Sequence, residues 1–254
     1  YSDSNETFWP AIYFAYKGSG DVKKAGSYTR VEIKSGSTYD DRPNRSDCKS
    51  APVCTYAEEI QNFANWYTYY RSRILAARAG IGRAFATQGN TIRVGFTTIN
   101  SGSTMLRNVA PFTSTQRAGF FTDLYNGKFN SIHYTPLRTS LQDVGNYFSR
   151  TDNNGPWATS AGSTAAHLTC RQSYNILMTD GYWSEGRSYN PNPAVGDLDK
   201  DGTADTLADV SLNYWKTDLR TDLANKVPTS TADPANWQHL VNFTVGLGVN
   251  GTLN

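Results

Sequence analysis

A short apolar run that ends in an acidic turn constrains the fold of this chain more than any other feature. Residues 175–178 (Asn-Ile-Leu-Met) lead directly into Thr179, Asp180 and Gly181. The run is typical of a strand that is buried on both faces and carries a carboxylate at its C-terminal tip. Ligands of open parallel sheets collect beyond the carboxyl ends of the strands, so Asp180 is placed for a cation or a polar ligand. Asp-Gly is also a common turn pair, and that simpler interpretation stays open.

Strand and helix patterns alternate along most of the chain. Strands are predicted over 91–99, 173–178 and 240–247, and helices are predicted over 55–85, 113–125, 136–148 and 205–227. The first helix begins with the capping-box pattern of Thr55 and Glu58. Strands separated by helical segments predict an α/β fold with a parallel sheet.

The N-terminal part has a different character. Two aromatic, β-like runs at 9–16 and 28–33 flank a Gly/Ser turn and predict a hairpin, which is followed by a polar, Cys-containing loop. We expect one domain over residues 1–254, in which residues 1–55 form a hairpin and loop insertion and residues 182–205 form a long loop. A chain of this size with 38% hydrophobic residues can bury a core of its own.

Two of the three cysteines favour a disulfide. Cys48 and Cys54 lie six residues apart in a polar loop, a spacing that can close a small covalent ring in an oxidising compartment. Cys170 is left over. The alternative, that all three are reduced, stays open.

Charge and composition exclude some classes of partner. The net charge is only +2 and the basic residues are scattered, so there is no footprint for nucleic acid. No apolar run approaches the ~18 residues that a membrane span requires. The 16 Tyr and 6 Trp favour a secreted or cell-surface protein. The polar first residues lack a signal region, so we expect a mature or excised piece of a protein.

An acidic loop predicts a calcium site. Asp197, Asp199 and Asp201 alternate and are followed by Gly202, which is the spacing of a calcium-binding loop. The predicted ligand set adds Thr203, Asp205 and Asp209 to these three aspartates. The last position of a helix–loop–helix calcium loop would need Glu, whereas this chain has Ala208, so a looser structural site is expected. The alternative is a solvated loop whose Asp205 caps the next helix.

A second candidate site combines Thr135, just before a predicted helix, with Asp180. A hydroxyl and a carboxylate outside the strand ends are hard oxygen ligands, suited to Mg²⁺ or Ca²⁺. The sequence has no nucleophile elbow, zinc-protease helix or phosphate-binding loop, so it nominates no enzyme. The three histidines, His133, His167 and His239, are expected to be structural or exposed.

Several motifs resemble a known family. Thr135-Pro136-Leu137 and the 175–181 segment resemble two elements of the metal-ion-dependent adhesion site of von Willebrand factor A domains. More narrowly, residues 62–71, 170–183, 205–209 and 213–220 resemble the N-terminal region of the PilY/PilC family of type IV pilus tip-associated adhesins. The resemblance implies a doubly wound, mainly parallel sheet flanked by helices, with Thr135 and Asp180 as metal ligands.

The resemblance also implies a role and a place in the cell. It implies an exported, non-enzymatic protein at the pilus tip, cell surface or outer membrane of a Gram-negative bacterium. Its partners would be minor pilins or the pilus tip and a ligand on a host or abiotic surface, and it would support pilus biogenesis, attachment and surface sensing. The alternative is a calcium-dependent carbohydrate-binding module of a secreted protein, which the aromatic content and the acidic loop support.

One departure from the family concerns the adhesion site. Its first metal element, Asp-x-Ser-x-Ser after a strand, is absent, and we expect that strand to precede this chain. Two ligands cannot replace an octahedral shell, so Mg²⁺ at Thr135 and Asp180 would be held weakly or not at all. The acidic loop, in contrast, is self-contained and is expected to bind Ca²⁺.

Overall fold

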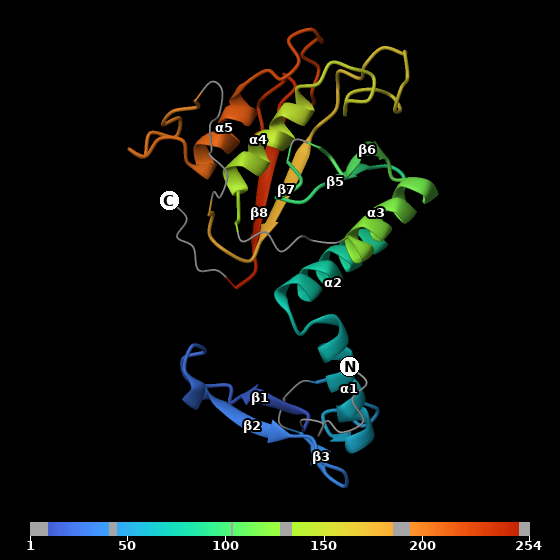
Figure 1. The fold of residues 1–254 in the computed structure, drawn as a ribbon, viewed down its shortest axis with the longest axis vertical. Coiled ribbons are helices and arrows are strands. Elements are labelled where there is room, and N and C mark those ends of the chain that lie inside the picture. The colour runs from blue at the N-terminus through green and yellow to red at the C-terminus, as the bar shows by residue number, and fades with distance from the viewer. Residues whose placement is uncertain (1–9, 41–44, 103, 128–133, 185–193, 249–254) are drawn as a thin grey trace. The chain divides into compact units, whose positions relative to one another are not determined.

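The structure, a computed structural model, describes residues 10–40, 45–102, 104–127, 134–184 and 194–248 (Figure 1). The chain divides into two compact units, an N-terminal unit of residues 1–79 and a C-terminal unit of residues 80–254. The organisation as a single domain stays a prediction. None of the helices in the described ranges has the length and apolar character needed to cross a bilayer.

The N-terminal unit is built around a hairpin and one helix. The predicted hairpin is confirmed, because β1 and β2 pair antiparallel from Ile12 opposite Glu32 to Tyr16 opposite Tyr28. The short strands β3 and β4 pair beside the start of α1. The elements of this unit are β1 (Ile12–Tyr16), η1 (Ala25–Ser27), β2 (Tyr28–Glu32), β3 (Thr38–Tyr39), β4 (Cys54–Thr55) and α1 (Tyr56–Tyr69).

The helical pattern predicted over 55–85 forms two helices. The capping box is confirmed, since the Thr55 side chain accepts from the Glu58 N–H and the Glu58 carboxylate accepts from the Thr55 N–H. The first helix ends at Tyr69, and α2 (Arg73–Ala86) begins three residues after Tyr70. The Ser72 hydroxyl accepts from the Leu75 N–H at 3.3 Å, which satisfies a donor of the new helix and favours the break.

The C-terminal unit contains the remaining strands and helices. Its helices are those predicted, although the last of them ends about ten residues earlier than expected. The elements are β5 (Arg93–Phe96), β6 (Arg107–Pro111), α3 (Ser114–Asn126), α4 (Leu137–Phe148), β7 (Tyr174–Thr179), α5 (Leu207–Lys216) and β8 (Val241–Gly246).

The predicted doubly wound parallel sheet is wrong. The described residues form four separate two-stranded sheets, of which only β7–β8 is parallel. The strand predicted over 91–99 does not join that pair, because β5 pairs antiparallel with β6 after a short connection. The alternating pattern at Val94 and Phe96 suits such a half-buried antiparallel ribbon. β5 therefore pairs with its neighbour β6 and does not extend the β7–β8 sheet.

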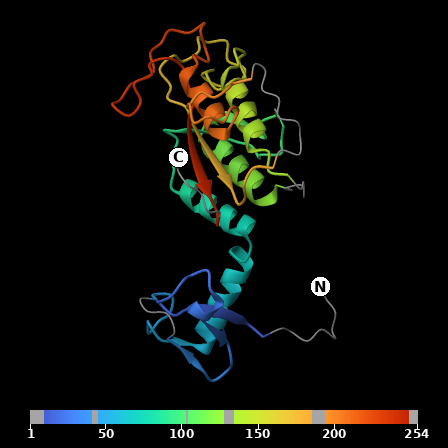
Figure 2. The ribbon, with the colours of Figure 1, turned by 90° about the vertical axis from the view of Figure 1, so that its left-hand side faces the viewer.

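The parallel pair also corrects the expectation of a strand buried on both faces. Tyr174 pairs with Val241 and Ile176 pairs with Phe243, so these apolar side chains share one face of the ribbon. Ile176 is 58% exposed and Phe243 is 54% exposed. The other face holds Leu177, which is buried, and the helices α4 and α5 lie beside the two strands (Figures 1 and 2). The described helices thus lie on the face that holds Leu177, where Asn242 of β8 donates to Ser211 of α5.

Two apolar clusters hold the C-terminal unit together. The smaller lies among α3, β5 and the end of β6, with Val94, Phe112, Phe120 and Leu124. The larger joins α4, α5 and the segments that flank them, and its members are Leu141, Val144, Tyr147, Phe148, Trp157, Val210, Tyr214, Leu219 and Leu240.

Candidate metal centre

The acidic loop folds into a tight set of turns just before α5. Gly202 has φ +93°, a conformation that favours glycine, and it lies where the calcium-loop spacing requires a sharp turn. Its N–H donates to the Asp197 carboxylate at 3.0 Å, and the Asp201 N–H donates to the other oxygen of Asp197 at 3.1 Å. The Asp197 side chain therefore organises the turn through which the chain passes.

Asp209 anchors the loop to the helix. It is fully buried and forms a capping box with Thr206, whose N–H and hydroxyl donate to one carboxylate oxygen at 2.9 and 2.8 Å. The other oxygen accepts from the Leu198 and Asp199 N–H groups at 2.6 and 3.3 Å. Burial alone would raise the pKa of Asp209, but these hydrogen bonds together lower it. The carboxylate is therefore held ionised inside the loop.

Three carboxylates converge in this loop. Oxygen atoms of Asp197, Asp199 and Asp209 lie within 4.8 Å of one another, and the first two residues are exposed. Among the described residues no Lys, Arg or His forms an ion pair with any of them. Desolvation and the neighbouring carboxylates raise the pKa of Asp199 against a lowering hydrogen bond from the Asp201 N–H. Such a group of oxygens, one of them buried, suits a hard divalent cation.

The geometry divides the predicted ligand set. Asp197, Asp199 and Asp209 come together, whereas Asp201 and Asp205 lie outside this group of three. Asp201 accepts from the Thr203 N–H at 2.8 Å, and Asp205 accepts from the Gly196 N–H at 2.8 Å. The helix is capped by Thr206 instead of Asp205, so the alternative assignment of the cap was wrong by one residue. Metal binding by the loop stays a prediction.

The second candidate site brings two chain segments together. Thr135 pairs with Ser184 through two backbone hydrogen bonds, at 2.9 and 3.0 Å. The Thr135 hydroxyl lies 4.0 Å from the point where a Cβ on Gly181 would stand. Asp180 is exposed at the end of β7, next to this contact. Thr135 and the turn that carries Asp180 are therefore neighbours, and their role as metal ligands stays a prediction.

Arg138 connects the two candidate sites. It lies in the first turn of α4, and its guanidinium donates to the Asp205 carbonyl at 3.0 Å. The same guanidinium lies 5.6 Å from the ring centre of Trp183, in the segment that pairs with Thr135. Sequence reasoning missed this residue. Its position in the first turn of the helix predicted just after Thr135 was the available signal.

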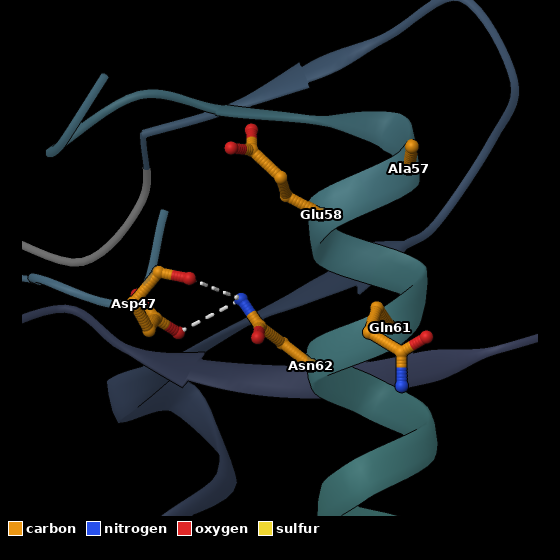
Figure 3. Close-up of a pocket in the computed structure, with 5 residues that line it drawn as sticks. All are labelled: Asp47, Ala57, Glu58, Gln61 and Asn62. Carbon is orange, nitrogen blue, oxygen red and sulfur yellow. Dashed lines mark hydrogen bonds between the residues drawn. The ribbon is translucent and has the colours of Figure 1, made fainter. Parts of the chain in front are cut away.

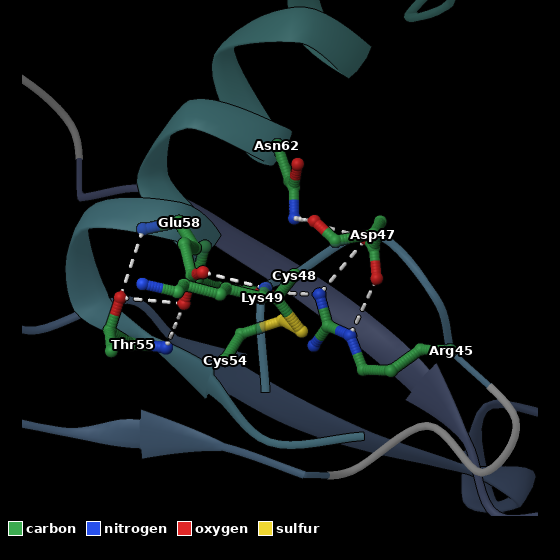
Figure 4. Close-up of polar contacts among 9 residues, drawn as sticks. Arg45, Asp47, Cys48, Lys49, Cys54, Thr55, Glu58 and Asn62 are labelled. Atoms are coloured by element: carbon green, nitrogen blue, oxygen red, sulfur yellow. Dashed lines mark hydrogen bonds and ion pairs between the residues drawn. A yellow bond between two sulfur atoms is a disulfide. The ribbon is translucent and has the colours of Figure 1, made fainter. Parts of the chain in front are cut away.

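The cysteine loop of the N-terminal unit has a different chemistry. The predicted Cys48–Cys54 disulfide is confirmed, and Cys170 is free and exposed. Arg45 is buried and binds Asp47 at 2.8 Å (Figure 4). It also binds the buried Glu59 at 2.6 Å. Hydrogen bonds to Asp47 and Glu59 raise the pKa of Arg45 despite its burial. Sequence reasoning missed this ion pair, since nothing local connects residues 45 and 59.

An open pocket with mostly polar lining residues lies beside that loop. It is lined by Asp47, Ala57, Glu58, Gln61 and Asn62, and the Asn62 amide donates to Asp47 at 3.0 Å (Figure 3). The backbone N–H groups of Lys49 and Thr55 donate to the Glu58 carboxylate, and these hydrogen bonds lower its pKa. The acidic side chains of the pocket are thus already satisfied within the protein.

The two described histidines are structural. Arg220 donates to Nδ1 of His167 at 3.0 Å, so that nitrogen accepts and Nε2 carries the proton toward Asn153. His239 faces two acceptors, the Trp237 carbonyl at 2.7 Å and the Asp233 carboxylate at 2.9 Å. His133 lies outside the described residues.

Known proteins resemble this chain over most of its length. The type IV pilus biogenesis factor PilY1 of Pseudomonas aeruginosa strain PAO1 is 31% identical across 92% of the chain and 25% of its own length. PilY1 of strain PAK is 30% identical across 96% of the chain and 22% of its own length, and PilY1 of strain UCBPP-PA14 is 32% identical across 76% and 19%. The chain is a distant homologue of PilY1.

The homology has a defined extent. The chain spans about a quarter or less of the length of the curated relatives it matches. No protein-family model and no solved structure matches it. The relation to a pilus biogenesis factor therefore agrees with the resemblance read from the motifs, whereas the assignment to the von Willebrand factor A type has no such support.

Proposed function

We propose that this chain is a non-enzymatic adhesion and assembly region of a type IV pilus tip-associated protein, and that it binds a divalent cation. Its role would be to support pilus biogenesis, surface attachment and surface sensing, with minor pilins or the pilus tip and a host or abiotic surface ligand as partners. The observation that carries the proposal is homology to PilY1 across nine-tenths of the chain.

The proposed location is outside the cytoplasm, at the pilus tip, cell surface or outer membrane of a Gram-negative bacterium. The Cys48–Cys54 disulfide supports export, because such bonds form and persist in oxidising compartments. The many exposed aromatic side chains, among them Tyr182 and Trp183, suit a protein that meets other surfaces.

The proposed cation is Ca²⁺, held by Asp197, Asp199 and Asp209. The support is their convergence with no ion-pairing cation among the described residues, and Ca²⁺ accepts carboxylate oxygens in flexible geometry. Backbone carbonyls and water would complete its shell. Mg²⁺ at Thr135 and Asp180 is a second, weaker part of the proposal, because the described residues supply few ligands there.

Calorimetry on chelated protein tests the calcium site. We expect saturable Ca²⁺ binding that Asp199→Asn weakens by about tenfold or more, since it removes one of three charged ligands. Asp201→Asn should have a smaller effect, because Asp201 lies outside the converging group. Asp40→Asn, an exposed aspartate elsewhere, is the charge-matched control. Absence of heat and of thermal stabilisation on adding Ca²⁺ would refute this part.

Binding to pili tests the adhesion role. The full-length protein carrying Asp199→Asn, and its Asp40→Asn control, should be compared for association with purified minor pilins and for attachment of cells to a surface. We expect the control to behave as wild type. If the wild-type protein binds no minor pilin and its deletion leaves piliation and attachment unchanged, the role is wrong even where calcium binds.

A calcium-dependent carbohydrate-binding module is the second candidate. The favouring observation is a group of half-exposed aromatic side chains on and after α1, which are Trp66, Tyr67, Tyr69 and Tyr70. A glycan array would distinguish the two candidates. Selective sugar binding that is lost in Trp66→Ala and in chelator would favour the carbohydrate module, and an array without signal would leave the pilus role as the better account.

A further inference from the structure

Two arginines of the C-terminal unit meet at one backbone carbonyl. Arg93, at the start of β5, and Arg171, just before β7, donate to the Ala158 oxygen at 3.2 and 2.9 Å. Arg93 also donates to the Thr159 and Val109 carbonyls, both at 3.1 Å, and Arg171 to the Pro156 carbonyl at 2.6 Å. The two guanidinium groups are therefore held close together by neutral acceptors.

Arg93 and Arg171 differ in this respect from four other arginines, which bind carboxylates. Arg45, Arg107, Arg150 and Arg220 each bind a carboxylate at 2.8 Å or less. Among the described residues no carboxylate lies within ion-pair distance of Arg93 or Arg171. Two like charges that are partly removed from water and unpaired are unfavourable unless an anion joins them.

The electrostatics of the pair agree with this geometry. Burial, followed by the charge of Arg93, lowers the pKa of Arg171 to about 10. Burial also lowers the pKa of Arg93. The titratable groups that act on the pair are Tyr147, whose hydroxyl accepts from the Val109 N–H at 2.8 Å, and the exposed Cys170. Neither supplies a carboxylate.

Donors remain available for a ligand. All the bonds that Arg171 makes to described residues use Nη1, so its Nε and Nη2 form an open edge. The Nε of Arg93 is buried and has no acceptor among the described residues, so Arg93 contributes its charge and Arg171 the open donors. Both residues are partly exposed. A guanidinium edge with two parallel N–H groups matches the spacing of oxygens on a carboxylate, sulfate or phosphate.

We propose that Arg93 and Arg171 form a binding site for an oxyanion. Arg171 supplies the open bidentate edge, and Arg93 supplies the second positive charge beside it. The site lies on β5 and on the segment before β7, and it shares no residue with the acidic loop. It therefore gives the C-terminal unit a contact point for anions that does not depend on a divalent cation.

Titration with small anions tests the site. Chelated protein should be titrated with sodium phosphate and, separately, with sodium acetate at matched ionic strength, using calorimetry and the NMR signals of the arginine Nε–H groups. We expect saturable binding of at least one anion, with the Arg171 signal shifted. Binding of phosphate alone would identify a tetrahedral ligand, whereas binding of acetate would identify a carboxylate group.

Substitutions of Arg171 test whether the arginine pair is responsible for the anion binding. Arg171→Gln should weaken binding by roughly tenfold or more, because it removes a charged two-pronged donor. Arg171→Lys should keep part of it, since the charge remains and the fork is lost. Arg30→Gln, at an exposed arginine of the N-terminal unit, is the control and should bind as wild type. Absence of saturable binding by the folded wild-type protein, or equal binding by Arg171→Gln, would overturn the proposal and leave the pair as a brace for residues 156–159.

Discussion

Two loops of this protein solve the same structural problem with different chemistry. The cysteine loop of residues 45–54 and the acidic loop of residues 196–205 each lead into a helix whose N-terminus is a threonine capping box. Each also gathers several carboxylates in a small volume. The first is closed by a disulfide, whereas the second is closed by hydrogen bonds from backbone N–H groups to aspartate side chains.

The loops differ in how the negative charge is balanced. Near the cysteine loop, the buried Arg45 forms ion pairs with both Asp47 and Glu59 and offsets part of their charge. In the acidic loop, no described cationic side chain pairs with Asp197, Asp199 or Asp209. One loop carries its counter-ion in its own sequence, and the other is suited to take one from solution. The comparison therefore predicts that only the acidic loop responds to calcium.

Removing Arg45, the cation of the cysteine loop, should lower the free energy of unfolding more than any other change predicted here. Arg45→Met removes the ion-pair partner of the buried Glu59, which costs about 3–5 kcal/mol for a broken buried ion pair. Urea denaturation, with hydrogen exchange of the α1 amides to localise the loss, measures it. The double variant Arg45→Met/Glu59→Leu should recover much of the stability, because the buried carboxylate is then removed together with its arginine. A single variant as stable as wild type would show that Glu59 is solvated or otherwise satisfied.

Removing the anchor of the acidic loop should rank second. Asp209→Ala leaves the partly buried Leu198 and Thr206 N–H groups without their acceptor, at a cost of about 2–3 kcal/mol. Asp209→Asn should cost less, since one oxygen can still accept. Denaturation in chelator, followed by the fluorescence of the buried Trp157, measures both. If calcium still stabilises Asp209→Ala as much as wild type, Asp209 is a structural residue only and not a ligand.

The Cys48–Cys54 disulfide should contribute less to the free energy of unfolding than either Arg45 or Asp209. Replacing both Cys48 and Cys54 with Ala opens a ring of six-residue spacing, for which loop-closure entropy gives about 2 kcal/mol. The loss should be confined to the N-terminal unit, and Cys170→Ala is the neutral control because Cys170 is free. Reduction that destabilises the acidic loop as well would mean that the two loops are not independent.

The sequence predicted the local elements better than the sheet that should join them. The hairpin, the capping box of Thr55 and the strand that ends before Asp180 follow from short-range patterns, and the structure contains all three. The parallel sheet was wrong because strand pairing depends on distant partners. The apolar run of β7 was assigned two buried faces, yet Ile176 is half-exposed, and periodicity alone cannot tell these cases apart.

The candidate sites show the same limit. The Asp-x-Asp spacing gave Asp197 and Asp199 correctly as neighbours, but it could not show that Asp209 turns back into the loop while Asp201 does not. That arrangement depends on the capping box of α5, which holds Asp209 in place. Arg45 with Glu59 and Arg93 with Arg171 are 14 and 78 residues apart, so no local motif connects either pair.

The smallest predicted effect is a pH dependence of calcium binding. Calcium binds the ionised aspartates, and the raised pKa of Asp199 means that this ligand takes up a proton first as the pH falls. Affinity should therefore begin to fall above the ordinary aspartate value of about 3.9, by up to about tenfold per pH unit once protonation is under way. Calorimetry between neutral pH and about pH 4.5 measures this decline.

The stability of the calcium-free protein should respond to falling pH with opposite signs at Asp199 and Asp209. In chelator, ionised Asp199 costs the folded state free energy above its raised pKa, and protonation relieves that cost as the pH falls. Asp209 has a lowered pKa, so its contribution is present above the unfolded value and is lost only at still lower pH. Asp199→Asn should remove the first effect and keep the second. Calcium affinity that stays constant down to pH 4.5 would show that Asp199 does not contact the ion, and the contrast between the two loops would then concern folding alone.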